Sequence, residues 1–270
     1  MKSSEESILI EKAFSKQAAV FDDEHRDNII VKYKRERVRK HLNAQLKPGS
    51  FTLEINCGTG DDAVFLAKVG HTLHCTDLSQ AMLNKLEDKI KNNGFNSSIT
   101  TQCCSFTDLN RLQNEKKYDH VFSNFGGLNC TGELYKVLNS FGNLLNPGGR
   151  ITLVIMPRFC LWENLLCLKG NFKTAFRRLK KNGAESNVEG VVFKSYYYSP
   201  HDVINQLKNK YTLEKLEGLC TLVPPSYLKN FPLRLPRFYN FLVRAENKLA
   251  NKWPWKNCGD YFIISLRKNN

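Results

Sequence analysis

Between residues 51 and 156 the chain alternates short β-type runs with stretches of helical periodicity. The β-type runs occupy 51–56, 72–76, 98–103, 118–123 and 150–156. Helical patterns lie between most of them, at 61–69, 79–92 and 132–145. Strands joined by helices of this length pair in parallel, through right-handed crossovers. The alternation therefore predicts an α/β fold built on a mostly parallel sheet with helices on both faces.

The regions on either side of this alternation follow other patterns. Residues 1–50 have helical periodicity and are expected to form an N-terminal helical flap, while 51–156 form the core. Residues 157–256 mix helical and aromatic strand-like stretches, including 191–198 and a helix that starts at Ser199-Pro200. We expect them to form a cap with part of the sheet, and 257–270 to supply the last strand. Strands at 212–222 and 260–266 would bring the sheet to about seven.

A glycine-containing loop follows the first predicted strand and opens the next helix. Gly58 and Gly60 allow a tight turn there, and Asp77 closes the next strand, where a carboxylate can accept both hydroxyls of a ribose. The spacing Gly58-x-Gly60-x-x-Ala63 also satisfies a dinucleotide fingerprint. However, Asp61 and Asp62 in the first helical turn are expected to repel a pyrophosphate. A cationic ligand suits the loop better.

At these residues the chain resembles the class I S-adenosylmethionine-dependent methyltransferases, and most of all those of quinone, lipid and secondary-metabolite synthesis. The loop at 54–60, the strand and turn at 118–125 and the turn at 144–150 are similar to successive family motifs. The resemblance implies a Rossmann-like fold with S-adenosylmethionine as cofactor. Two residues depart from the family pattern: Asn56 stands in place of the first loop glycine, and Ser105 stands where an acid often holds the adenine amine.

The resemblance also implies a set of cofactor-binding residues. In it the loop holds the amino acid end of the cofactor, Asp77 holds the ribose, and an upstream aromatic residue and an arginine lie near the cofactor carboxylate. The full set is Phe21, Arg35, Glu54, Asn56, Gly58, Gly60, Asp61, Asp77, Leu78, Met82, Ser105, Phe106 and Asn124.

Methyl transfer needs alignment of the acceptor more than a dedicated base, because the sulfonium already activates the methyl carbon. Asn124 and Phe125 are expected beside the methyl group as positioning residues, with Gly126 and Gly127 allowing close approach. For a weakly acidic hydroxyl acceptor, the candidate bases are His25, His201 and the tyrosines at 196–198. None of them is assigned that role. His120 is expected to be packed inside its strand.

The formal net charge of +14 is concentrated in the second half of the chain. Residues 158–256 contain 18 basic and 7 acidic residues, together with aromatic side chains such as Trp162 and Phe238. This mixture suits an apolar or aromatic acceptor with an acidic head, or peripheral contact with anionic lipid. We therefore expect transfer to the oxygen or carbon of a small, hydrophobic or aromatic/acidic acceptor. An RNA or protein methyltransferase and a non-catalytic S-adenosylmethionine-binding protein are the alternatives.

Other features narrow the class of protein. The longest apolar run, at 151–156, is far shorter than a membrane-spanning helix requires. Nine cysteines without a C-x-x-C pair fit neither a disulfide framework nor a zinc site, so no metal is expected. A cytoplasmic location follows from these features and from an N-terminus without signal-peptide character. DNA is not an expected partner, and RNA stays open although the chain has no recognised RNA-binding signature.

Overall fold

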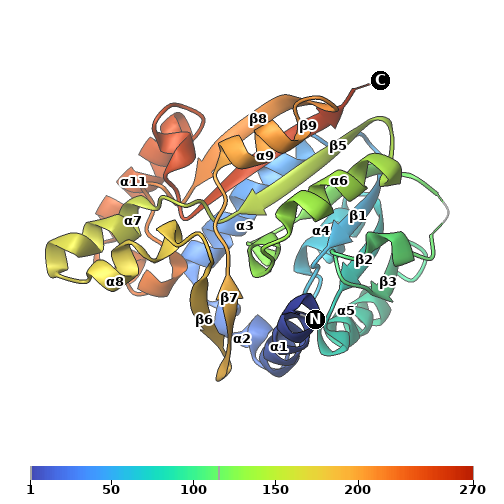
Figure 1. Ribbon diagram of the computed structural model, residues 1–270, viewed down its shortest axis with the longest axis horizontal. Helices are drawn as coiled ribbons and strands as arrows, with labels where there is room; N and C mark the ends of the chain where they lie inside the picture. Colours follow the sequence, from blue (N-terminus) through green and yellow to red (C-terminus); the bar gives the residue numbers. More distant parts are fainter. Residues whose placement is uncertain (1, 115, 270) are drawn as a thin grey trace.

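The computed structural model describes residues 2–114 and 116–269. Its main sheet has seven strands in the order β3-β2-β1-β4-β5-β9-β8 (Figure 1). The strands are β1 (Phe51–Ile55), β2 (Thr72–Asp77), β3 (Ile99–Cys103), β4 (Tyr118–Ser123), β5 (Leu145–Ile155), β8 (Tyr211–Leu219) and β9 (Tyr261–Lys268). The first five are parallel, and β9 is antiparallel to both β5 and β8. The predicted Rossmann-like, mostly parallel sheet is confirmed.

Helices cover both faces of the sheet, which explains why its central strands are buried on both sides. On one face, Leu53 and Ile55 pack with side chains of α6 (Leu134–Leu144) and α9 (Pro200–Leu207). On the other, Phe122 and Val154 pack with side chains of α3, α4 and α5. These three helices are Ile29–Asn43, Asp61–Lys68 and Gln80–Asn93. The two hydrophobic cores hold the loops at the strand ends in place.

Local sequence signals start and end several of these helices. The Ser79 side chain accepts a hydrogen bond from the amide of Met82 at the start of α5, and Gly94 ends that helix in the left-handed conformation. At α9 the predicted start is confirmed, because Ser199 and Asp202 form a capping box with Pro200 in the first turn. Boundaries with such signals lie within one residue of those predicted.

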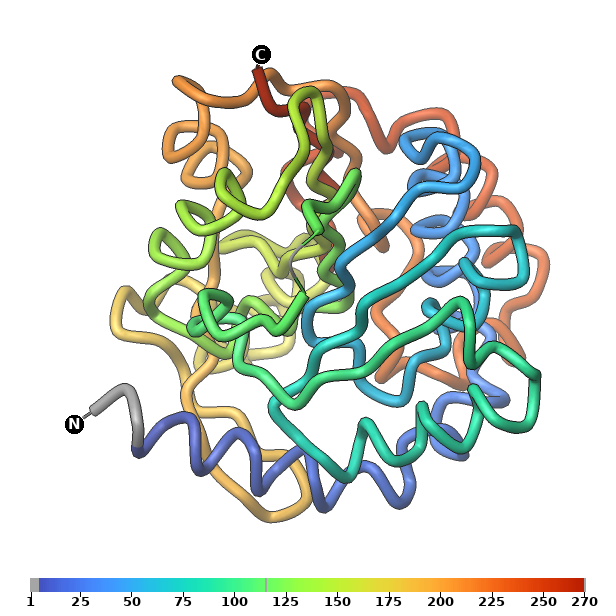
Figure 2. Tube along the Cα trace, turned by 90° about the vertical axis from the view of Figure 1, so that its right-hand side faces the viewer, coloured from blue at the N-terminus to red at the C-terminus, as the bar shows by residue number. Residues whose placement is uncertain are grey.

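The N-terminal helices α1 (Lys2–Gln17) and α2 (Phe21–Arg26) lie outside the sheet, across the ends of its strands (Figure 2). Helix α1 packs between α5 and a separate two-stranded hairpin. The rings of Phe14 and Phe193 have centroids 6.0 Å apart, and the hydroxyls of Ser15 and Ser79 are 2.8 Å apart. The first helix is thus attached to the core on one side and to the hairpin on the other.

The hairpin consists of β6 (Ala184–Val188) and β7 (Val191–Ser195), and only the second strand was predicted. The other elements of this region are α7 (Leu161–Asn164), α8 (Phe172–Ala175), α10 (Phe231–Arg234) and α11 (Pro236–Leu249). Both α7 and α8 are short, and each is followed by a 3₁₀ turn. Within residues 2–114 and 116–269, none of the helices combines the length and apolar character needed to cross a bilayer.

A buried ion network ties the start of this region to β9. Arg178 donates to the carboxylates of Glu163 and Asp260 at 2.6 and 2.8 Å, and Arg177 also donates to Glu163. Burial opposes ionisation of Glu163, but these hydrogen bonds outweigh it and lower the pKa of the carboxyl group. Because Arg178 is almost fully buried, removing a carboxylate partner would leave its charge poorly compensated inside the protein.

Candidate functional site

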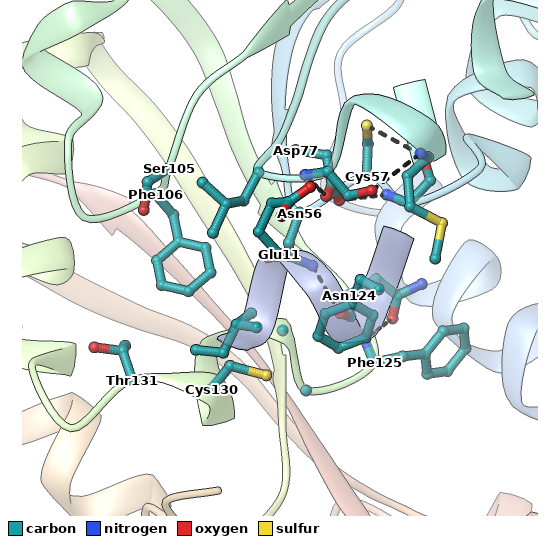
Figure 3. Close-up of a pocket in the computed structure, with 18 of the residues that line it drawn as sticks. Glu11, Asn56, Cys57, Asp77, Ser105, Phe106, Asn124, Phe125, Cys130 and Thr131 are labelled. Atoms are coloured by element: carbon teal, nitrogen blue, oxygen red, sulfur yellow. Dashed lines mark hydrogen bonds between the residues drawn. The ribbon is translucent and has the colours of Figure 1, made fainter. Parts of the chain in front are cut away.

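A cavity of about 450 Å³ opens at the carboxyl ends of β1, β2 and β4. It lies where the strand order changes direction, since the chain runs from β1 to β2 and β3 on one side and from β4 to β5 on the other. Open α/β sheets bind ligands at this point. In Figure 3, Ser105 and Phe106 lie on one side of the cavity and Asn124 and Phe125 on another, with Asn56 and Asp77 between them.

Nearly all the predicted site residues are brought together here. The cavity is lined by Phe21, Arg35, Glu54, Asn56, Gly58, Asp61, Asp77, Leu78, Met82, Ser105, Phe106, Asn124 and Phe125. Gly60 does not line it. A Cβ at Gly60 would overlap the Leu86 side chain of α5, and its φ is +76°. Glycine at position 60 therefore makes room for the Leu86 side chain. The resemblance had instead placed Gly60 among the cofactor-binding residues.

Asp77 and Gly58 are joined by a hydrogen bond at the cavity wall. The Gly58 amide donates to Asp77 Oδ2 and the Ser79 amide to Oδ1, each at 2.9 Å. Burial outweighs these bonds and raises the pKa of Asp77. Gly58 has a φ of +56°, and a Cβ there would meet no protein atom within 4 Å. The loop thus presents an oriented carboxyl group beside open space, as a ribose site requires.

Asn56 and Phe125 are non-glycine residues of the cavity wall with positive φ, of +52° and +41°. Asn56 Nδ2 donates to the Asn124 carbonyl at 3.1 Å, and its Oδ1 accepts from Ser123 Oγ at 2.6 Å. A Cβ at Gly127 would overlap the Asn56 side chain. Asn56 stands where the family has a glycine, and its side chain links the end of β1 to the end of β4. This link fits because Gly127 has no side chain.

The side chain of Asn124 forms hydrogen bonds within the protein through both its nitrogen and its oxygen. Its Nδ2 donates to Asp62 Oδ2 at 2.6 Å and its Oδ1 accepts from the Phe125 amide at 2.8 Å. The sequence suggested that this amide aligns the acceptor. In the structure it instead fixes the turn after β4, and the ring of Phe125 packs edge-on against Tyr261 with centroids 5.9 Å apart.

Asp61 and Asp62 are both paired with cations, which changes the electrostatic argument made from the sequence. Asp61 lies 3.2 Å from Arg35 and 2.6 Å from Lys89, and Asp62 lies 2.8 Å from Arg39. Burial raises the pKa of Asp61, but these cations outweigh it and the net shift is downward. Because their charges are neutralised locally, the two acids repel an anion less than their sequence position implied.

The cavity as a whole remains acidic. Its walls carry the carboxyl groups of Glu6, Glu11, Glu54, Asp61, Asp62, Asp77 and Glu133. Among the described lining residues, Arg35 is the one with a basic side chain. Glu54 is buried, and burial followed by the charge of Asp62 raises its pKa well above the usual range. This acidic character contrasts with the net charge of +14 for the chain.

Of the candidate bases, Tyr196 lines the cavity, and its hydroxyl donates to Glu6 at 3.1 Å. Tyr198 donates its hydroxyl to the Thr131 carbonyl, and Tyr197 is buried against Arg178. His25 bonds to the Phe21 carbonyl, and His201 lies on the exposed side of α9. His120 is packed as predicted, with Nε2 3.0 Å from Thr152 Oγ1.

Sequence reasoning missed two groups of lining residues. The first lies on α1, and the second begins at the last residue of the 3₁₀ turn after β4. They are Glu6, Ser7, Ile10, Glu11 and Phe14, and Cys130, Thr131, Gly132 and Glu133. The spacing of Ile10 and Phe14 indicated that α1 has an apolar face, but nothing in the sequence specified what that face covers.

Comparison with known proteins agrees with this architecture. Residues 52–149 match a family described as "Methyltransferase domain". An uncharacterized protein of Methanocaldococcus jannaschii is 26% identical over 254 residues, spanning 92% of this chain and 94% of that protein.

Two solved structures illustrate the likeness in fold. One is the 1,6-didemethyltoxoflavin-N1-methyltransferase of Burkholderia thailandensis, solved with bound 1,6-didemethyltoxoflavin and S-adenosylhomocysteine. It superposes with a TM-score of 0.59 at 13% identity, covering 99% of this chain and 90% of the other. The other is the N-methyltransferase NodS of Bradyrhizobium japonicum, with a TM-score of 0.55 at 12% identity and coverage of 96% and 97%. The match shows a methyltransferase domain at residues 52–149, and the seven-stranded sheet with a cavity at its switch point agrees with the resemblance to the class I S-adenosylmethionine-dependent methyltransferases.

Proposed function

We propose that the cavity holds S-adenosylmethionine between the Gly58 loop and Asp77, and that the protein methylates a small acceptor at oxygen or carbon. The observation that carries the proposal is the Asp77 carboxyl group, which two backbone amides orient beside the open space at Gly58. When bound, the cofactor supplies a methyl group on a positively charged sulfur.

The lining residues suggest how the cofactor is held. Asp77 would accept the ribose hydroxyls, and Leu78, Met82, Ser105 and Phe106 would surround the adenine. The Ser105 hydroxyl lies 2.8 Å from that of Thr107, so a hydroxyl pair stands where an acid was expected. Glu54 and Asp61 would face the ammonium group, while Phe21 and Arg35 would lie toward the carboxylate.

The charge of the cavity supports a cationic cofactor and bears on the acceptor. Asp61 and Asp62 are neutralised by neighbouring cations, and the raised pKa of Glu54 disfavours its charged form. The negative charge that favours a cationic ligand therefore comes from the other carboxyl groups of the cavity wall, Glu6, Glu11, Asp77 and Glu133. The same field opposes a carboxylate or phosphate on the acceptor. Apolar side chains of Ile10, Phe14, Phe106 and Phe125 form much of the remaining wall. We therefore propose an acceptor with an apolar body and no anionic head. The basic residues at 158–256 had also allowed an acceptor with an acidic head.

The residues near the turn after β4 would act through position. Asn56, Asn124 and Asp62 form a continuous hydrogen-bonded chain that fixes the backbone from 123 to 127. Phe125 closes one side and limits access of water. A rigid, dry wall of this kind favours in-line displacement because the acceptor loses little further freedom on reaching the transition state.

Titration calorimetry with S-adenosylhomocysteine tests the proposal. We expect binding to the unaltered protein, and a loss of at least ~10-fold in affinity for Asp77→Ala, since a charged acceptor of two hydrogen bonds is removed. Asp88→Ala, on the exposed side of α5, is the matched control and should bind normally. Binding of NADH with no heat from S-adenosylhomocysteine would contradict the proposal. Transfer of a labelled methyl group to a component of cell extract, lost in Asp77→Ala, would separate an enzyme from a non-catalytic binding protein.

A further inference from the structure

The outer surface of α10 and α11 exposes large apolar side chains with no role in the core. Leu233, Leu235, Phe238 and Phe241 are 68%, 50%, 49% and 61% exposed, and we call this surface the α10–α11 face. Helix α11 already buries another side through Tyr239, Leu242 and Glu246. Its packing against the protein therefore does not explain why its outward positions are aromatic.

The aromatic rings of this surface are held in a row that begins inside the protein. Trp162 of α7 contacts Phe231 with ring centroids 6.0 Å apart, and Phe231 contacts Phe238 at 6.1 Å. Phe238 and Phe241 then stack at 6.2 Å with an angle of 14° between the rings. Because each ring supports the next, the outer two are presented at the surface with little freedom to fold back.

The charges on this surface have one sign. From 220 to 256 the chain has seven basic residues and a single acid, Glu246. That acid is buried and accepts hydrogen bonds from the backbone amides of 220–223 at 2.8 to 3.0 Å. On α11, Arg237, Phe241, Arg244 and Lys248 follow one another at intervals of four, three and four residues and share one stripe. Exposed charge on this stripe is thus entirely positive.

A neighbouring segment has the same character. Residues 157–183 contain one acid, Glu163, which is buried and paired with Arg177 and Arg178. The same segment exposes Leu168, Phe172 and Phe176 at 85%, 59% and 49%. Figure 1 shows α7, α8 and α11 at the same end of the molecule, away from α6. The basic and apolar character therefore extends over that end.

We propose that the α10–α11 face docks on an anionic lipid surface, with Phe238 and Phe241 entering the headgroup region and Arg237 and Arg244 facing lipid phosphates. A stripe of cations beside exposed aromatic and aliphatic side chains is the arrangement that favours binding in the plane of a bilayer interface. The aliphatic Leu233 and Leu235 favour lipid over a nucleic acid, because bases stack on rings but offer no apolar medium for leucine. None of the described residues that line the cavity lies on α10 or α11, so different elements form the docking surface and the cavity.

Co-sedimentation of the whole protein with lipid vesicles tests this inference and needs no catalytic activity, so its outcome is separate from that of the proposed function. The vesicles are pure phosphatidylcholine, or an equal mixture of phosphatidylcholine and phosphatidylglycerol. We expect binding to the mixture alone, weakening as salt screens the charges. The Phe238→Ala, Phe241→Ala double variant should bind at least ~10-fold more weakly, since two aromatic side chains no longer leave water.

Charge and surface controls complete the design. Arg237→Glu with Arg244→Glu should abolish binding to the anionic mixture. Tyr135→Ala with Lys136→Glu changes an exposed aromatic residue and an exposed cation on α6, and should leave binding intact. Thermal unfolding checks that every variant folds. Equal binding of the α11 variants and the unaltered protein would overturn the inference. So would tight binding to a single-stranded RNA oligonucleotide, lost in the α11 variants, together with no binding to either vesicle.

Discussion

Two glycines of the same loop, Gly58 and Gly60, are expected to fail in different ways when each is replaced by alanine. Both have positive φ, so each alanine variant loses roughly 1–2 kcal/mol of stability from backbone strain alone. At Gly60 the new methyl group also overlaps Leu86, and overpacking of a core costs a further ~1–3 kcal/mol. We therefore expect Gly60→Ala to lose ~2–5 kcal/mol and Gly58→Ala only ~1–2 kcal/mol.

Binding should show the opposite order. The space beside Gly58 is open and Gly58 lines the cavity, so an added methyl group there occupies room that we assign to the ligand. Gly60 does not line the cavity. Gly58→Ala should thus lose affinity for S-adenosylhomocysteine while remaining folded, whereas folded Gly60→Ala should retain most of its affinity.

Urea denaturation and calorimetry on the two variants measure both quantities. A double-mutant cycle adds Leu86→Ala, which removes the side chain that Gly60→Ala overlaps. The destabilisation in Gly60→Ala, Leu86→Ala should fall short of the sum of the single effects by ~1–3 kcal/mol. Equal stability of Gly58→Ala and Gly60→Ala, or strictly additive effects in the cycle, would refute the assignment of Gly60 to packing. Unchanged affinity of Gly58→Ala would refute the assignment of Gly58 to the ligand.

Three further predictions concern stability. Burial lowers the pKa of His120 to about 3. Between this value and the usual histidine pKa, the unfolded chain therefore binds more protons than the folded protein. The contribution of His120 to the free energy of unfolding is present above the usual histidine pKa and is lost as the pH falls toward the pKa of the folded state. In His120→Gln, urea denaturation at several pH values should show a slope smaller by up to about 1.4 kcal/mol per pH unit, and an unchanged slope would contradict this. Asp62→Ala should cost ~3–5 kcal/mol because it removes the carboxylate that the buried Asn124 amide and the part-buried Arg39 share, against ~1 kcal/mol or less for the more exposed Asp61→Ala; equal losses on urea denaturation would count against it. Arg178→Met should lower the free energy of unfolding by ~3–5 kcal/mol because the buried Asp260 loses its close cation, while Glu163 keeps Arg177; adding Asp260→Asn should restore part of the loss.

Much of the core was predictable because its signals are local. The alternation from 51 to 156, the caps at Ser79 and Ser199 and the glycine loop each lie within one short segment. Parallel pairing and the position of the cavity follow from them through general rules of α/β folds. Most of the predicted lining residues accordingly come from the ends of β1, β2 and β4 or the turn after β3, and the others, Phe21, Arg35, Asp61 and Met82, lie on α2, α3, α4 and α5.

Of the two hairpin strands, only β7 was predicted, because β6 has the largely polar sequence Ala-Glu-Ser-Asn-Val. A usable signal lay in its turn, where Glu189 and Gly190 both have positive φ and Val188 pairs with Val191. A two-residue turn of this type favours glycine at its second position. A turn at Glu189-Gly190 predicts one strand before it and one strand after it.

The remaining differences concern partners that are distant in sequence. From the sequence, Asp61 and Asp62 were expected to be unpaired carboxylates at the start of a helix. In the structure they are neutralised by cations from two other helices, Arg35 and Arg39 of α3 and Lys89 of α5. Asn56 looked like a lost glycine until its contacts with Ser123 and Asn124 were visible. Residue type and spacing along one chain do not specify such pairings, since they arise only when separate elements pack.

The position of α1 couples ligand occupancy to the order of the N-terminal helix. Glu6, Ile10 and Phe14 of this helix form one wall of the cavity, and its attachments to the rest of the protein include the Ser15–Ser79 contact and the hydrogen bond from Tyr196 to Glu6. A molecule that contacts this wall binds the attached helix better than the detached one. By mass action, a molecule bound in the cavity against Ile10 and Phe14 is therefore expected to stabilise the attached position of α1.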